Sequence, residues 1–450
     1  MTEVTGAPRR VGAGLVRALR ADPLEEMSRL VREHGDLVRF RAAGRHIVLA
    51  AHPDAVQQVL QSRHTRYSKR TPPIHRLRSV LGEGLVTSEG DHWRSQRRTI
   101  QPAFKFSEIR ALTPTIEEIV EAELAPWHRR DVAEPRDIAG EMRRLAFRVV
   151  GITLLGADLA DLVDDARGAL ELLQDQANSR LYRVTAPPSW IPTRPNRGFR
   201  RALVELGHVV DRVIDRLHAQ PEHERTAFSS LIESMPAAQF RDELVTLLLA
   251  GHENTGNALA WMLDLVSRNP EVERSARSEV DGSLDGRPLT SGLLAELPYT
   301  RQVVLEALRI YPPSWLLLRR AEHPDRIGEH EVARGTLVMV SPYLTHRHEQ
   351  FWPDPEAFDP GRFTAERMPE HRCAFIPFGA GPRKCIGDQF ALIEMQVVLC
   401  SVLRHFRLRP EGPPPRPRAA VSLLPDGGLW MTPVLRARAA HERVRGSGAS

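Results

Sequence analysis

The stretch FGAGPRKCIG, residues 378–387, decides the fold. It places Cys385 at the end of a tight, glycine-rich loop, and a helix is predicted from just after Cys385 to about residue 403. A thiol at a helix N-terminus lies at the positive end of the helix dipole, which favours the thiolate. Gly379, Gly381 and Gly387 permit positive φ and close backbone approach. The loop is therefore predicted to point N–H groups at the sulfur and to accept a flat macrocycle against its backbone.

A lone cysteine is most often a small buried apolar residue, and we read Cys373 and Cys400 in that way. Cys400 also lies on the apolar stripe of the predicted helix, which consists of Ile386, Phe390, Ile393, Val397 and Cys400. Cys385 differs because it completes the specific pattern F-x-x-G-x-R-x-C-x-G. Thiolate ligation of haem iron is the arrangement that promotes O–O cleavage.

This pattern resembles the cytochrome P450 family in its bacterial form. The resemblance implies a mainly α fold with minor β structure and a haem b cofactor (iron protoporphyrin IX). It implies that Cys385 is the proximal metal ligand, that Phe378 packs beside the sulfur, and that Arg383 pairs with a haem propionate. Gly387 completes the cofactor-binding loop.

Three further segments extend the resemblance along the chain. Glu306 and Arg309 are three residues apart on a predicted helix at about 298–310, which Pro312 and Pro313 follow. Such a pair is usually a surface ion pair. In the family it joins an arginine that Arg362 matches here, so we predict a buried structural triad that fixes the cysteine loop.

The second segment, residues 90–104, reads GDHWRSQRRTIQPAF. Trp93 and Arg97 are four residues apart and share a helix face. Indole and guanidinium groups both donate to carboxylates. The resemblance implies that Trp93 and Arg97 face a haem propionate, and that Arg319 is a further propionate contact. The alternative is a basic helix on the surface.

The third segment, AGHENT at residues 250–255, lies within a long apolar helix predicted at 242–267. Gly251 and Gly256 each cost about 1 kcal/mol in a helix interior, which predicts a local bulge or kink. The family places an acid followed by threonine here, in an oxygen-binding groove that relays protons. Glu253 fits the acid, but Asn254 stands where the alcohol is usual and Thr255 follows it. We therefore expect catalytic roles among these three residues and leave the relay assignment open.

Composition restricts the remaining possibilities. The formal net charge of +5 is too small to indicate nucleic-acid binding. Three cysteines cannot form a disulfide framework, which indicates a reducing cytosol. The first 30 residues are charged throughout and contain neither a signal peptide nor a membrane span. We expect a cytoplasmic monomer without a membrane anchor.

Periodicity and turn residues predict the other elements. We expect a β-hairpin at 37–49 around Gly44, and strands near 330–345 and 420–434. Further helices are expected near 107–124, 136–155, 160–180 and 198–218, with loops at 184–196 and 352–382. These elements form one haem domain over residues 1–450, with a small β-rich part at about 30–60 and a large helical part at about 61–450.

The resemblance implies a monooxygenase that inserts one oxygen atom from O2 into a lipophilic small molecule, such as a terpene or polyketide of secondary metabolism. A ferredoxin and its reductase would donate electrons at a basic face that contains Arg94, Arg98, Lys105 and Lys384. Asn254 keeps other classes open: a peroxygenase, an isomerase or dehydratase, or a non-catalytic haem sensor. The resemblance implies the following pocket lining: Leu77, Val80, Leu81, Val86, Leu181, Trp190, Leu247, Ala250, Trp315, Leu316, Leu317 and Leu423.

Overall fold

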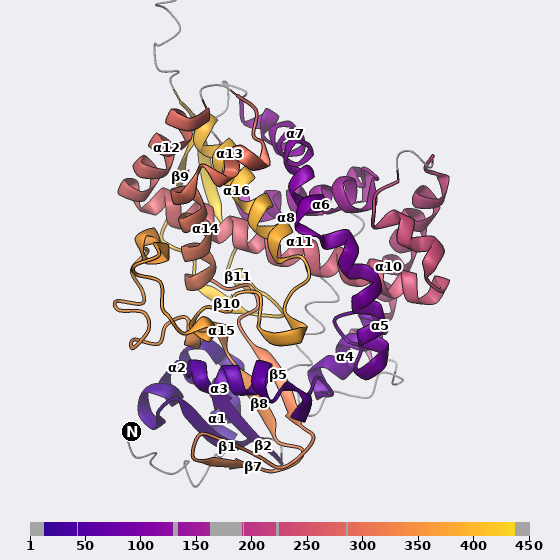
Figure 1. The fold of residues 1–450 in the computed structure, drawn as a ribbon, viewed down its shortest axis with the longest axis vertical. Coiled ribbons are helices and arrows are strands. Elements are labelled where there is room, and N and C mark those ends of the chain that lie inside the picture. Colours follow the sequence, from indigo (N-terminus) through magenta and orange to yellow (C-terminus); the bar gives the residue numbers. More distant parts are fainter. Residues whose placement is uncertain are drawn as a thin grey trace, which may run out of the picture.

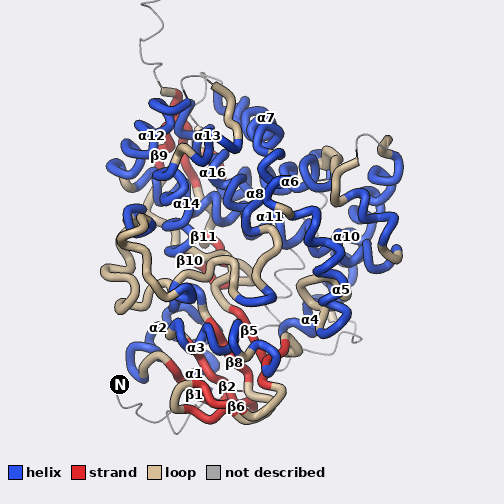
Figure 2. Tube along the Cα trace, viewed as in Figure 1, coloured by secondary structure: helices blue, strands red, loops and turns tan. Residues whose placement is uncertain are grey.

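The computed structural model describes residues 13–436, apart from 43, 129–133, 163–190, 192, 222–224 and 285–286. Helices make up most of the molecule, and a strand-rich part lies at one end (Figures 1 and 2). The helices are α1 (Ala13–Ala21), α2 (Pro23–His34), α3 (Pro53–Gln57), α4 (Pro72–Leu81), α5 (Gly90–Ile100), α6 (Phe106–Ala111), α7 (Thr113–Leu124), α8 (Ile138–Val150), α10 (Arg194–Ala219), α11 (Ala237–Arg268), α12 (Pro270–Leu284), α13 (Ser291–Ala295), α14 (Pro298–Ile310), α15 (Pro342–Thr345) and α16 (Asp388–His405).

The strands form one larger sheet and three small ones. They are β1 (Leu37–Ala42), β2 (Arg45–Ala50), β3 (Tyr67–Ser68), β4 (Arg136–Asp137), β5 (Leu317–Ala321), β6 (Asp325–Ile327), β7 (His330–Val332), β8 (Leu337–Val340), β9 (Phe406–Pro410), β10 (Pro417–Ala419), β11 (Leu423–Pro425) and β12 (Trp430–Leu435). The five-stranded sheet has the order β1-β2-β8-β5-β3, in which β2 and β8 are parallel. This sheet therefore joins the N-terminal hairpin to strands that follow α14.

The hairpin prediction is confirmed. β1 and β2 pair antiparallel from Leu37 opposite Ala50 to Ala42 opposite Arg45, and Gly44 has φ 76° in the turn. In β1, Val38 and Phe40 are buried and Arg39 between them is exposed, as alternation predicts for a strand covered on one face. The predicted fold class, mainly α with minor β, is also confirmed.

The cysteine loop rests on this sheet. Cys373, Ile376 and Ala380 share a buried cluster with sheet residues such as Val338 and with Leu60. α16 then leaves the loop and enters the large helical core, where Cys400 is fully buried. The loop thus lies between the two cores and is supported from both sides.

The bulge predicted in the long helix is wrong, because α11 is α-helical from Ala237 to Arg268. Its glycines instead allow α8 to approach closely. A Cβ at Gly256 would lie 2.6 Å from the Cα of Arg143, and one at Gly251 would lie 2.9 Å from a methyl group of Val150. The interruption of regular helix lies in the chain after α8, where Gly151–Leu155 forms a π-helical turn.

Two boundaries also differ from the predictions. Residues 194–196 belong to α10, because Thr193 caps that helix by accepting a hydrogen bond from the backbone N–H of Asn196. Residues 342–345 form α15 rather than strand, because Ser341 caps this short helix in the same way. Most of the helix expected at 160–180 and of the loop expected from 184 lies outside the described residues.

Candidate functional site

The cysteine loop is fixed by its own backbone. The N–H of Cys385 donates to the carbonyl of Phe378 over 2.9 Å, and Gly379 and Gly381 both have φ 71°. A Cβ at Gly381 would lie 1.9 Å from the carbonyl oxygen of Leu60, so no side chain fits there. The loop therefore presents Cys385 in one orientation, directly before α16.

The Cys385 side chain is accessible to solvent, yet protein groups surround it closely enough that burial raises the pKa of its thiol. A hydrogen bond from the backbone of Gly387 and the charge of Arg97 act in the opposite direction and lower this pKa. Both would stabilise a thiolate once a metal ion compensates the burial.

Behind the loop, three cations surround a single carboxylate. Arg383 forms an ion pair with Glu89 at 3.2 Å, stacks on the ring of Trp93 at 3.9 Å, and donates to the carbonyl of Ser88. The Lys69 ammonium donates to the carbonyl of Val86 at 2.7 Å. Arg319 is buried on β5. Together these groups carry a net positive charge in a buried environment.

The pKa values of two of these cations reflect the excess of positive charge around Glu89. Burial, together with the charges of Arg319 and Arg383, lowers the pKa of Lys69 to about 7. Burial and Arg383 lower the pKa of Arg319 to about 10. Within the described part of the chain Arg319 forms no ion pair, and its guanidinium donates only to the carbonyl of Leu318 at 3.0 Å. This cluster has the chemistry of an anion site.

Arg97 lies on α5 beside the cysteine loop. Its guanidinium donates to the carbonyl of Lys384 over 3.1 Å. Burial lowers its pKa, whereas Cys385 and Asp388 raise it. Sequence reasoning placed Trp93 and Arg97 together on a carboxylate. That role stays a prediction; in the structure Trp93 stacks with Arg383, and Arg97 bridges α5 to the residue before Cys385.

The middle of α11 offers a second set of polar groups. Ala250 is exposed and Asn254 half-buried in an otherwise buried stretch, and the Asn254 amide donates to the Ala250 carbonyl at 3.3 Å. Glu253 and Thr255 are buried on other faces of the helix. Burial raises the pKa of Glu253 to about 7, although Arg143 lowers it, and one carboxyl oxygen has no hydrogen-bond partner among the described residues.

The predicted buried triad is confirmed. Arg309 binds both carboxylate oxygens of Glu306, at 2.7 and 2.8 Å, and both side chains are fully buried. Arg362 lies 3.4 Å from the same carboxylate. The remaining donors of Arg309 bind the carbonyls of His346, Pro355 and Ala357.

The triad is connected to the cysteine loop through two side chains. The His346 ring accepts a hydrogen bond from the backbone N–H of Ile376 at 2.8 Å. The Trp352 indole donates to the carbonyl of Ala374 at 3.1 Å, and Arg309 stacks on its ring. Through these two side chains the triad therefore holds in place the segment that leads into residues 378–385.

The pocket lining stays a prediction, and the structure shows how exposed each of its described members is. Trp315 is buried because its indole donates to the carbonyl of Ala420 and packs against α2 residues. Leu423 and Leu81 are also core residues, so none of these three is an open lining residue. Leu181 and Trp190 lie outside the described residues. The partly exposed members of the prediction are Leu77, Val80, Val86, Leu247, Ala250, Leu316 and Leu317.

Sequence reasoning missed Lys69 and Glu89. Lys69 follows the short strand β3, and its backbone N–H donates to the Glu89 carboxylate at 2.7 Å. Neither residue stands at a recognisable spacing from the cysteine motif, and only the fold brings them together. The one available signal was the rarity of lysine in this arginine-rich chain.

These residues fit a haem. The accessible thiol before α16 supplies the soft ligand that haem iron accepts. The buried excess of cations around Glu89 suits the two propionates of the macrocycle, because buried positive charge is stable only when it is paired. Gly379, next to Leu317, leaves the backbone bare on the side of the sheet.

Comparisons with known proteins agree with this site. The family described as Cytochrome P450 matches residues 9–431. Cyclooctatin synthase of Streptomyces melanosporofaciens is 35% identical and covers 94% of this chain and 93% of its own. Pentalenene oxygenase of Streptomyces avermitilis is 30% identical, covering 86% and 87%. The crystal structure of CYP175A1 from Thermus thermophilus superimposes with a TM-score of 0.78 at 29% identity, covering 95% of this chain and 100% of its own.

In the part of the chain that the structure describes, no helix combines the length and apolar character needed to cross a membrane. The motif around Cys385, the buried triad on α14 and the match over nearly the whole sequence converge on one conclusion: the chain belongs to the cytochrome P450 family.

Proposed function

We propose that this P450 monooxygenase oxidises a terpene skeleton in secondary metabolism. The observation that carries the proposal is the likeness, over more than four-fifths of the chain, to relatives named cyclooctatin synthase, cyclooctat-9-en-7-ol 5-monooxygenase and pentalenene oxygenase. The open face of α11 around Leu247 and Ala250 is apolar and supports a lipophilic substrate.

The cofactor we propose is haem b, with Cys385 as the iron ligand. Arg383, Arg319 and Lys69 would bind the propionates, and Trp93 would hold the Arg383 guanidinium in place. Arg97 and Phe378 support the cysteine loop, and the N–H of Gly387 would stabilise the thiolate. Bound haem supplies the activation of O2, and the protein supplies orientation, protons and exclusion of water.

We assign proton supply to Glu253. Its raised pKa keeps a proton available near neutral pH, which suits a general acid. Asn254 would hold a water molecule in position but would not transfer a proton. An amide donates and accepts hydrogen bonds but does not relay a proton as a hydroxyl does. Thr255 is buried on another face of α11 and is the second candidate for proton supply.

Asn254 also motivates a second candidate, a peroxygenase, which needs no proton relay for O2. Turnover driven by hydrogen peroxide alone, at a rate equal to that with electron donors, would favour it. Turnover that requires reduced donors and O2 would reject it.

For the electron donor we propose an acidic ferredoxin served by a separate reductase. Arg94, Arg98, Lys105 and Lys384 are all exposed. Arg97 contacts the backbone of Lys384, so a charge at either residue lies close to Cys385. A cytosolic location and a monomeric state remain predictions from the sequence.

The deciding experiment is a substrate panel on the haem-loaded protein. Polycyclic terpene hydrocarbons and their alcohols are expected to convert the Soret band towards the high-spin form, and hydroxylated products should follow with ferredoxin and reductase. Fatty acids and macrolides of similar size serve as controls. A spin-state change and turnover with those controls, but with none of the terpenes, would overturn the proposed substrate class.

A further inference from the structure

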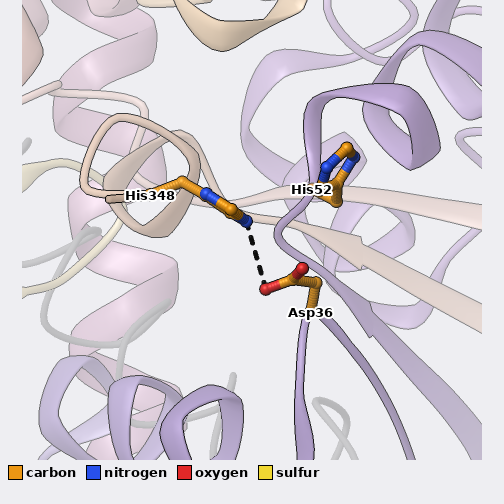
Figure 3. A group of neighbouring side chains, drawn as sticks. All are labelled: Asp36, His52 and His348. Carbon is orange, nitrogen blue, oxygen red and sulfur yellow. Dashed lines mark ion pairs between the residues drawn. The ribbon is translucent and has the colours of Figure 1, made fainter. Parts of the chain in front are cut away.

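Three potential metal ligands meet at the edge of the strand-rich part, away from the cysteine loop. Asp36 lies between α2 and β1, His52 caps α3, and His348 follows α15. Their ligand atoms all lie within 4.8 Å of one another. Figure 3 shows the three side chains converging from two parts of the chain, with His348 directed at Asp36.

The pair formed by His348 and Asp36 has the spacing expected of two ligands of one ion. The Nε2 atom of His348 lies 3.2 Å from Oδ1 of Asp36. Two ligands of a tetrahedral zinc ion, each at 2.0–2.2 Å from the metal, lie about 3.4 Å apart. Nε2 of His348 already pairs with the Asp36 carboxylate, and this contact lowers the pKa of Asp36. Nδ1 of His348 is buried and has no hydrogen-bond partner among the described residues.

The surroundings hold the rings in place. Phe351 packs edge-on against both imidazoles, with centroids 5.4 Å from His52 and 5.2 Å from His348. Nδ1 of His52 accepts a hydrogen bond from the backbone N–H of Asp54 at 3.2 Å, and the Asp54 carboxylate lies 2.9 Å from Nε2 of His371. These contacts fix the His52 ring at the start of α3.

We propose that Asp36, His52 and His348 form a structural site for zinc or a similar transition-metal ion. Two imidazoles and one carboxylate suit Zn²⁺, whereas Ca²⁺ and Mg²⁺ prefer all-oxygen sites. The ion would clamp the N-terminal hairpin to the segment after α15. That segment also carries His346 and Arg347, which bind the backbone of α14 and of the loop before Cys385. The clamp is separate from the haem site and does not depend on the substrate assignment.

The test uses the full-length, haem-loaded protein without an affinity tag, dialysed against buffered free Zn²⁺ at micromolar concentration. Metal analysis of zinc and iron in the same sample is expected to give one zinc per haem iron. His52→Gln, His348→Gln and Asp36→Asn should each weaken zinc binding by about tenfold or more. His64→Gln, which changes an exposed histidine elsewhere in the same part of the molecule, is the matched control and should bind normally.

Absence of bound zinc in the wild-type protein, or equal zinc in the variant lacking all three ligands, would overturn the proposal. The cluster would then be an ordinary ion pair between Asp36 and His348, with the His52 ring edge-on to that of His348. If variants lose haem, X-ray absorption at the zinc edge of the wild-type protein decides instead. Two imidazoles and one carboxylate in the first coordination sphere support the site, and fewer than two imidazoles contradict it.

Discussion

At the scale of single residues, Cys385 and Cys400 show two uses of the same side chain. Cys400 is buried within α16, and burial raises the pKa of its thiol to about 12, so it behaves as a small apolar residue. Cys385 stands before the same helix and is accessible. Cys385→Ala should abolish the red-shifted Soret band of the reduced CO complex. Cys400→Ala, the control, should keep it, and the reverse pattern would refute the ligand assignment.

A second residue-scale prediction concerns Glu253. Because its pKa in the folded protein, about 7, lies above the ordinary value of 4.5, the folded protein holds a proton there that the unfolded chain releases. The stability contributed by the neutral acid, and its ability to supply a proton, are therefore present at low pH and are lost as pH rises through about 7.

The wild-type yield of product per reduced nucleotide should accordingly fall above pH 7, with more peroxide formed. Glu253→Gln should slow product formation by about 10²–10⁴-fold and should remove this pH dependence. Asn254→Thr is the matched neighbour and should preserve the yield. An unchanged yield in Glu253→Gln, with haem content intact, would instead give the acid role to another group such as Thr255.

Sequence patterns identify residues whose neighbours along the chain reveal their chemistry. Cys385 and Arg383 lie in one loop, and Glu306 and Arg309 lie one helical turn apart, so these local patterns, together with the family resemblance, indicated them. Lys69 was missed because it lies far from Arg319 in the sequence, and the pairing of β3 with β5 brings the two cations together. The spacing of residues within one segment carries no information about such a long-range contact.

At the scale of elements, the close contact of α8 and α11 depends on glycine. Gly256→Ala would drive a methyl group into the backbone of Arg143 and should destabilise the protein by about 1–3 kcal/mol. Gly282→Ala in α12 is the matched control, because no atom lies within 4 Å of its added methyl group. It should stabilise by about 0.5–1 kcal/mol through helix propensity. Thermal unfolding of both variants, followed by circular dichroism, measures the difference. Equal midpoints would contradict the packing role.

The chain also offers a comparison of two ion pairs with the same spacing. Glu306 and Arg309 are fully buried, whereas Glu271 and Arg274 are exposed. Glu306→Ala leaves a buried guanidinium without its counterion and should cost about 3–5 kcal/mol. We expect little soluble haem-loaded protein. Glu271→Ala should change stability by less than about 1 kcal/mol. A stable Glu306→Ala variant with a normal CO spectrum would show that the triad does not hold the cysteine loop.

At the scale of the whole molecule, a basic face should steer the electron donor. Replacing Arg94 and Arg98 by glutamate should slow ferredoxin association by about tenfold or more at low salt. The difference should shrink as salt rises. Arg45 and Arg334, exposed in the strand-rich part, provide a charge-matched control pair. Stopped-flow reduction across a salt series measures both, and equal slowing in the control pair would reject a localised docking face.

Much of the architecture could be predicted because its elements carry local signals. The hairpin around Gly44 and the helix that ends at Ile310 were expected within a few residues of their observed bounds. The parallel pairing of β2 with β8 could not be predicted, because the two strands are far apart in the sequence and meet in the interior of the sheet. How the chain divides into domains remains a prediction.

The contact between Gly381 and the carbonyl of Leu60 has a consequence for recombined enzymes. A hybrid that takes its first sixty residues from one parent and its haem loop from another must reproduce both sides of this contact, since the two backbones leave no space for a side chain. A crossover point between these two segments would place the Leu60 segment of one parent against the Gly381 loop of the other. Libraries that inherit residues 58–62 and 378–387 as one block should therefore yield a larger share of haem-containing offspring.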